Sequence, residues 1–101
     1  MEIPIACSLD ASEARAQLGE WKEIFALVVT RVERISPSRF EATLREQSAG
    51  LSELVQLAQR EKTCCPFFDF SLIIGAASTT FVVVVPDDAS SVLDEFVMSI
   101  S

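Results

Sequence analysis

Residues 61–67 have the sequence Glu-Lys-Thr-Cys-Cys-Pro-Phe, and they mark the place where a helix gives way to a β-hairpin. Before them, the apolar residues of segment 48–65 recur at the helical spacing of three and four. These apolar positions are Leu51, Leu54, Ala58 and Cys65, with Val55 and Leu57 on either side. Because Pro66 cannot continue a helix, we expect the helix to end at the two cysteines.

Segments on both sides of this helix have the composition of antiparallel strands. Downstream, residues 67–74 and 80–85 are rich in β-branched and aromatic side chains, and Gly75-Ala76-Ala77-Ser78 separates them as a turn. Upstream, apolar and polar residues alternate through 39–45 after the turn Ser36-Pro37-Ser38. We therefore expect two hairpins, one before the helix and one after it.

The two ends of the chain add a strand and two helices. Ile3, Ile5, Cys7 and Leu9 alternate with smaller or polar residues, which predicts a short strand with one buried face. A helix capped by Asp10 then carries an apolar stripe, as does a short helix near the C-terminus. The first stripe is Ala14, Leu18, Trp21, Phe25 and Val28, and the second is Val92, Leu93, Phe96, Val97 and Ile100.

The expected order is β-α-β-β-α-β-β-α, in a single domain of residues 1–101. This order is typical of an α+β two-layer sandwich, a mainly antiparallel sheet with helices packed on one face. The strands of the last hairpin are apolar on both faces, whereas a single layer of helices covers only one face of a sheet. We therefore hypothesise a homodimer that covers the second face or an edge of the sheet.

Composition excludes several classes of function. The net charge of −7, from 15 acidic and 8 basic residues, argues against nucleic acids and anionic membrane surfaces as partners. The longest apolar runs, 24–29 and 81–86, are too short to span a bilayer, and Met1–Ile5 does not resemble a signal peptide. We expect a cytoplasmic protein whose three cysteines are reduced thiols.

The chemistry-bearing residues are Cys64, Cys65 and Glu61, with Cys7 on the inward side of the first strand. Glu61 lies three and four residues before the cysteine pair, so it can reach both on a helix. A helix C-terminus and a carboxylate both disfavour a free thiolate and favour a bound cation. The chain has no histidine to act as a base, which argues against cysteine-hydrolase chemistry.

Three thiolates, with Glu61 as a fourth ligand or a neighbouring charge, suit Cu(I), Zn(II), Hg(II) or As(III). The leading hypothesis is therefore a metal-binding role in sequestration, sensing or delivery, without turnover. One alternative is a dimeric module that binds a small molecule or a protein, in which the cysteines are part of the core. Another is a thiol redox protein that uses the cysteine pair, which requires an exposed and reactive thiol.

The chain also resembles a group of small bacterial domains, some of which are appended to MerR-type metal-responsive regulators. The resemblance covers most of the chain and rests on a strand motif, an Arg and Glu-Trp helix, and a Cys-Cys-Pro-Phe motif. Here these are Ala6-Cys7-Ser8-Leu9, Arg15, Glu20-Trp21, Glu61, Cys64-Cys65-Pro66-Phe67 and Phe70-Ser71-Leu72. It implies that Cys7, Glu61, Cys64 and Cys65 act together, with heavy metals or metalloids as ligands and a metal-responsive regulator as a partner.

Overall fold

The computed structural model describes residues 11–45 and 50–100. Its three helices and four strands follow the order α-β-β-α-β-β-α, with a single 3-10 turn before the last helix. The elements are α1 (Ala11–Val28), β1 (Val29–Ser36), β2 (Arg39–Leu44), α2 (Leu51–Cys64), β3 (Asp69–Ile74), β4 (Thr79–Val84), η1 (Asp87–Ala89) and α3 (Ser90–Ile100). The predicted strand at Ile3–Leu9 lies outside the described residues.

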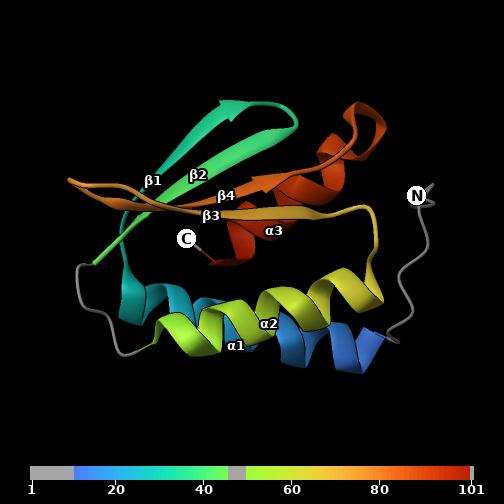
Figure 1. Ribbon diagram of the computed structural model, residues 1–101. Coiled ribbons are helices and arrows are strands. Elements are labelled where there is room, and N and C mark those ends of the chain that lie inside the picture. The colour runs from blue at the N-terminus through green and yellow to red at the C-terminus, as the bar shows by residue number, and fades with distance from the viewer. Residues whose placement is uncertain (1–10, 46–49, 101) are drawn as a thin grey trace.

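The four strands form one antiparallel sheet in the order β1-β2-β4-β3. Each hairpin joins neighbouring strands, and the pairing of β2 with β4 joins the two hairpins. The helices lie against one face of this sheet, with α1 and α2 side by side (Figure 1). The predicted α+β architecture, an antiparallel sheet with helices on one face, is confirmed.

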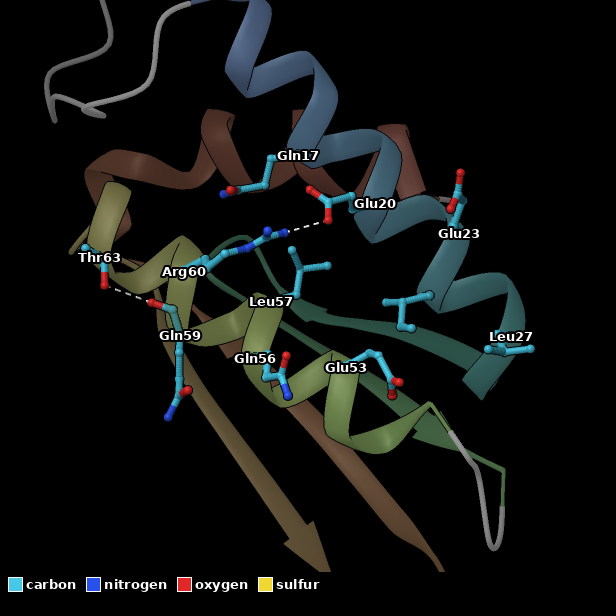
Figure 2. Close-up of a pocket in the computed structure, with 11 residues that line it drawn as sticks. Gln17, Glu20, Glu23, Leu27, Glu53, Gln56, Leu57, Gln59, Arg60 and Thr63 are labelled. Atoms are coloured by element: carbon cyan, nitrogen blue, oxygen red, sulfur yellow. Dashed lines mark hydrogen bonds and ion pairs between the residues drawn. The ribbon is translucent and has the colours of Figure 1, made fainter.

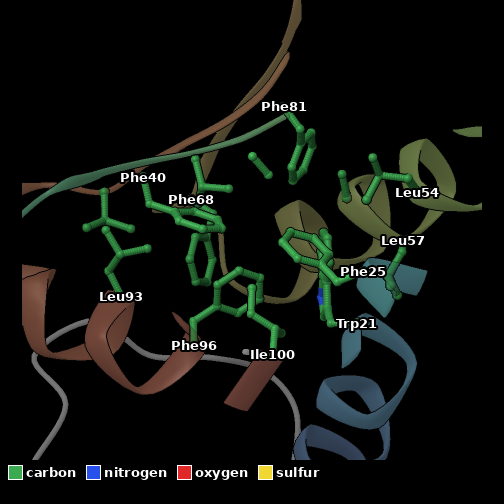
Figure 3. Close-up of a cluster of buried hydrophobic side chains, with 14 of the residues drawn as sticks. Trp21, Phe25, Phe40, Leu54, Leu57, Phe68, Phe81, Leu93, Phe96 and Ile100 are labelled. Atoms are coloured by element: carbon green, nitrogen blue, oxygen red, sulfur yellow. The ribbon is translucent and has the colours of Figure 1, made fainter. Parts of the chain in front are cut away.

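One hydrophobic core fills the space between the sheet and the helices, and Trp21 lies at its centre. The indole of Trp21 is fully buried and contacts the rings of Phe25, Phe70, Phe81 and Phe96 at centroid distances of 5.1–6.0 Å. Figure 3 shows the rings of Trp21, Phe25, Phe81 and Phe96, which come from α1, the sheet and α3. Trp21, Phe25 and Val28 are buried as the apolar stripe predicts, and so are Phe40, Ala42 and Leu44 on β2.

The element boundaries differ from expectation at the cysteine pair. Helix α2 ends at Cys64, so Cys65 is its C-cap, with φ of −130° and ψ of 81°. Strand β3 starts at Asp69, two residues later than predicted, because residues 65–68 form a turn in which the Phe68 amide donates to the Cys65 carbonyl at 3.1 Å. Cys65 therefore lies one residue beyond the helix, but it is buried with the rest of the predicted stripe, with 4% exposed.

The second face of the sheet is more polar than the sequence suggests. Residues opposite one another on paired strands share a face, and one such row runs Glu33, Glu41, Val82 and Ser71 across the sheet. Val82, on the central strand β4, is only 2% exposed although it lies outside the helix-side core. Apolar residues on both faces of β4 therefore do not by themselves require a second molecule.

Two glycines in this fold should respond to alanine in opposite directions. A Cβ on Gly50 would lie 2.5 Å from Cγ1 of the fully buried Val28, whereas a Cβ on Gly19 meets no described atom within 4 Å. We expect Gly50→Ala to lower the free energy of unfolding by about 1–3 kcal/mol through overpacking. Gly19→Ala, inside helix α1, should raise it by about 0.5–1 kcal/mol. Urea denaturation of both variants checks this, and a destabilised Gly19→Ala would contradict it.

Candidate functional site

The carboxylate of Glu61 is held between helices α1 and α2. Glu61 is 7% exposed, and its Oε1 accepts hydrogen bonds from Nε1 of Trp21 at 2.8 Å and from Nε2 of Gln17 at 3.0 Å. Both donors lie on α1 and are four residues apart, so they project from the same face of that helix. A buried carboxylate is costly unless it is hydrogen-bonded, and these two neutral donors meet that need.

Gln17 is a site residue that the sequence analysis did not single out. Its side chain is 8% exposed, which is unusual for an amide on a helix surface. The sequence feature that could have identified Gln17 is its position four residues before Trp21, next to the apolar stripe of α1. The expected cationic partner of a core Glu61 is not among the described side chains, because the nearby Arg60 pairs instead with Glu20 at 2.7 Å.

The turn after α2 is held by backbone and lysine contacts. The Cys65 amide donates to the Glu61 carbonyl at 2.7 Å, which closes the last turn of the helix. Nζ of Lys62 then donates to the carbonyl oxygens of Pro66 at 2.6 Å and Phe68 at 2.9 Å. A lysine near a helix C-terminus also interacts favourably with the helix dipole. Lys62 therefore fixes the path of the chain from the cysteine pair into β3.

Cys65 is buried beside Glu61, and its sulfur is in a disulfide. The other two cysteines of the chain are Cys7 and Cys64. Cys7 lies outside the described residues, and only the backbone of Cys64 is described. The expectation that all three thiols are free is thus wrong at Cys65.

The described side chains alone do not assemble a metal site. Among residues 11–45 and 50–100, no group of three or more His, Cys, Asp or Glu side chains is placed to hold a metal ion. Of the four predicted ligands, Cys65 and Glu61 lie near each other at the end of α2. Any larger ligand set depends on Cys7 and Cys64.

A groove of about 1000 Å³ runs between α1 and α2, next to the buried Glu61 and its donor Gln17 (Figure 2). Gln17 lines the groove and also donates to Glu61, so the buried carboxylate lies directly behind the groove wall. The ion pair between Glu20 and Arg60 bridges the two helices across it. The other lining residues are Glu23, Ile24, Leu27, Glu53, Gln56, Leu57, Gln59 and Thr63.

The arginines of the first hairpin do not form an anion site. Arg31 pairs with Glu33 at 3.2 Å and Arg39 with Glu41 at 2.9 Å, each along its own strand, and Arg34 reaches Asp94 of α3 at 2.7 Å. Each of these three arginines is thereby paired with a carboxylate of the same chain.

No helix of the described residues has both the length and the apolar content needed to cross a bilayer.

No family model matches the chain, and neither a curated protein nor a solved structure matches it.

Proposed function

We propose that the protein binds a soft metal or metalloid ion through its reduced cysteines, at the junction of α2 and β3. The candidate ligands are Cys7, Cys64 and Cys65, with Glu61 as a fourth ligand or an adjacent negative charge. Thiolates favour Cu(I), Hg(II) and As(III), and a mixed sulfur and carboxylate set also suits Zn(II). The role is sequestration, sensing or delivery, and a metal-responsive regulator is the partner proposed for it.

The observation that carries this proposal is the buried Cys65, which is in a disulfide and whose amide bonds to the carbonyl of the buried Glu61. Two sulfurs that can form a disulfide are close enough, once reduced, to chelate one ion. The carboxylate, held by Trp21 and Gln17, adds negative charge that a bound cation would neutralise. In the oxidised protein, which contains the disulfide, the site would then be unable to bind a metal ion.

Titration of the reduced, metal-free protein with Hg(II), Cu(I), Zn(II) and As(III) tests the proposal. We expect saturation at one ion per chain for at least one of them, with thiolate charge-transfer absorbance and protection of all three thiols from alkylation. Cys7→Ser, Cys64→Ser and Cys65→Ser should each abolish tight binding. Glu61→Gln keeps an oxygen for Trp21 and Gln17 but removes the charge, so it should weaken binding by about 10–100-fold.

The disulfide provides an internal control for this experiment. The oxidised protein should take up no ion, and binding should return after reduction. If the thiols of the reduced protein stay unprotected at saturating metal and react only after unfolding, the cysteines are core residues and the proposal is wrong. A Cys65→Ser variant that is poorly folded but still binds metal through the other cysteines would also assign Cys65 to packing.

A thiol redox role is the second candidate, and the disulfide at Cys65 is the observation that favours it. In that role the dithiol would exchange with a small disulfide such as oxidised glutathione, through a mixed disulfide at the more exposed sulfur. A reactive thiol is alkylated faster than a model peptide at pH 7. Alkylation of the reduced protein no faster than the peptide would exclude this role and leave metal binding in place.

A further inference from the structure

The groove between α1 and α2 is a surface to which the proposed metal site assigns no role. Glu20 of α1 pairs with Arg60 of α2 at 2.7 Å, and a Cβ on Gly50, just before α2, would lie 2.5 Å from Cγ1 of Val28 at the end of α1. The two helices are therefore antiparallel, and the groove runs along both of them (Figure 2).

Each helix contributes side chains to the groove at the spacing of one helical face. Positions 20, 23, 24 and 27 of α1 and positions 53, 56, 57 and 60 of α2 line it and follow the same pattern. Residues at this spacing lie on one side of a helix over two turns. The lining positions of α1 from 17 to 27 span about 15 Å along the helix axis, at about 1.5 Å per residue. The groove is therefore as long as about three turns of a further α-helix.

Three apolar side chains line this groove, and one of them is largely exposed. Leu57 is buried, Ile24 is partly buried against the core, and Leu27 is exposed over more than half of its surface. A ligand that covers Leu27 would remove apolar surface from water, which favours binding. The groove is therefore suited to a ligand with an apolar face.

The charged residues along the groove are mostly acidic. The described lining residues include three glutamates and one arginine, and this arginine, Arg60, is paired with Glu20. Among the described residues, Glu23 and Glu53 have no ion-pair partner. They belong to different helices, so each wall of the groove carries an unpaired carboxylate. An occupant with positive charge on both of its sides would therefore be attracted.

The groove suits a helix better than an extended peptide or a small molecule. Every described lining residue lies on α1 or α2, whose backbone groups are hydrogen-bonded within the helix, so the walls offer side chains only. An extended peptide would bury amides and carbonyls there without partners, whereas a helix satisfies its own. A pocket for a small molecule usually surrounds most of its ligand, and walls from two helices leave the outer side open.

We propose that this groove binds a basic amphipathic helix of a partner protein. The apolar stripe of that helix would contact Ile24, Leu27 and Leu57. Lys or Arg residues on the two flanks of the stripe would pair with Glu23 on one side and Glu53 on the other, as flanking charges do in coiled coils. A second copy of this chain is a poorer occupant, because each copy has a net charge of −7. The proposal does not depend on metal binding, since none of its contacts involves a cysteine.

Fluorescence anisotropy with synthetic peptides and the reduced, metal-free protein tests the proposal. The first probe is a labelled peptide of about 18 residues, long enough to form a helix on binding, with Leu at three-and-four spacing and Lys on both flanks of the Leu stripe. The second probe has Glu in place of every Lys. We expect the Lys peptide to bind at least about tenfold more tightly, and its helicity, measured by circular dichroism, to rise on binding. Equal affinities, or a bound Lys peptide that stays non-helical, would overturn the proposal.

Matched variants separate the groove from the general negative charge of the protein. Glu23→Gln and Glu53→Gln should each weaken binding of the Lys peptide by about 2–5-fold, the factor that corresponds to one exposed ion pair. Glu95→Gln removes the same charge from the exposed surface of α3, outside the groove, and should change the affinity by less than about 1.5-fold. Equal effects at all three positions would show unspecific attraction and contradict a docking site.

A second pair of variants tests the apolar contact. Leu27→Ala should weaken binding of the Lys peptide by about tenfold, whereas Ile73→Ala, at an exposed apolar residue of β3, should leave it unchanged. Both side chains are more than half exposed, so both variants should fold. The same loss of affinity in both variants would contradict a contact at Leu27.

Light scattering identifies a competing occupant of the groove. We expect the Lys peptide to bind at one per chain, without changing the number of chains in the particle. If the free protein is instead a dimer that Leu27→Asp dissociates, a second copy occupies the groove and the proposal is wrong.

Discussion

Replacing Trp21 by alanine should leave much of the protein unfolded at room temperature. The substitution removes the largest fully buried side chain and the centre of the ring cluster, which for a tryptophan costs about 3–5 kcal/mol. It also removes a donor from the buried carboxylate of Glu61, which adds about 1–3 kcal/mol. A domain of this size has a total stability of about 5–15 kcal/mol, so the two losses together reach that range.

Far-UV circular dichroism during urea denaturation measures this effect, since the variant has no other tryptophan for fluorescence. Trp21→Phe serves as the matched control, because it keeps a ring in the core and loses the hydrogen bond and part of the volume. Leu27→Ala is a surface control on the same helix, with 59% of Leu27 exposed. The order of destabilisation should be Trp21→Ala, then Trp21→Phe, then Leu27→Ala. A Trp21→Ala variant with near wild-type stability would mean that the core repacks without the indole.

Removing the carboxylate of Glu61 should have the second-largest effect on stability. In Glu61→Ala, the amide of Gln17 and the indole N–H of Trp21 lose their shared acceptor, and each buried donor left without a partner costs about 1–3 kcal/mol. Glu61→Gln retains an oxygen at the same position, so we expect its free energy of unfolding to lie within about 1 kcal/mol of the wild type. Chemical denaturation of both variants in the reduced state gives the comparison.

The two variants Glu61→Ala and Glu61→Gln also distinguish a structural role of the carboxylate from a role in binding. If the carboxylate serves only to satisfy Gln17 and Trp21, then Glu61→Gln should leave both stability and metal affinity unchanged. If its charge supports a bound cation, the same variant should stay folded but bind metal more weakly. Equal destabilisation by alanine and glutamine would show instead that the hydrogen bonds to Oε1 do not account for the burial of Glu61.

Local patterns in the sequence were sufficient for most of the secondary structure. The three-and-four spacing of Trp21, Phe25 and Val28 predicts a helix with that face buried, and the alternation of Phe40, Ala42 and Leu44 predicts a strand with one buried face. Pro66 correctly predicts that α2 ends near the cysteine pair. These signals work because side-chain direction depends on position within a few neighbouring residues.

The candidate site was only partly predictable. Glu61 stood out because a carboxylate beside an apolar stripe needs an explanation, but its partners are 40 and 44 residues away in the sequence. The ion pairs of the arginines likewise follow no sequence pattern, since Arg31 and Arg39 pair along their own strands and Arg34 reaches α3. No local pattern identifies such partners, because they depend on how distant elements pack.

The sequence by itself determined the type and order of the described elements, the core faces of α1 and β2, and the motif Glu61 to Phe67. The tertiary structure alone decided that β4 lies between β2 and β3, that Val82 is buried on the second face, and that Trp21 and Gln17 enclose Glu61. The physical reason is that helix and strand periodicities are local properties of the chain. Strand order, edge exposure and buried hydrogen-bond partners arise only when segments far apart in the sequence are brought together in one core.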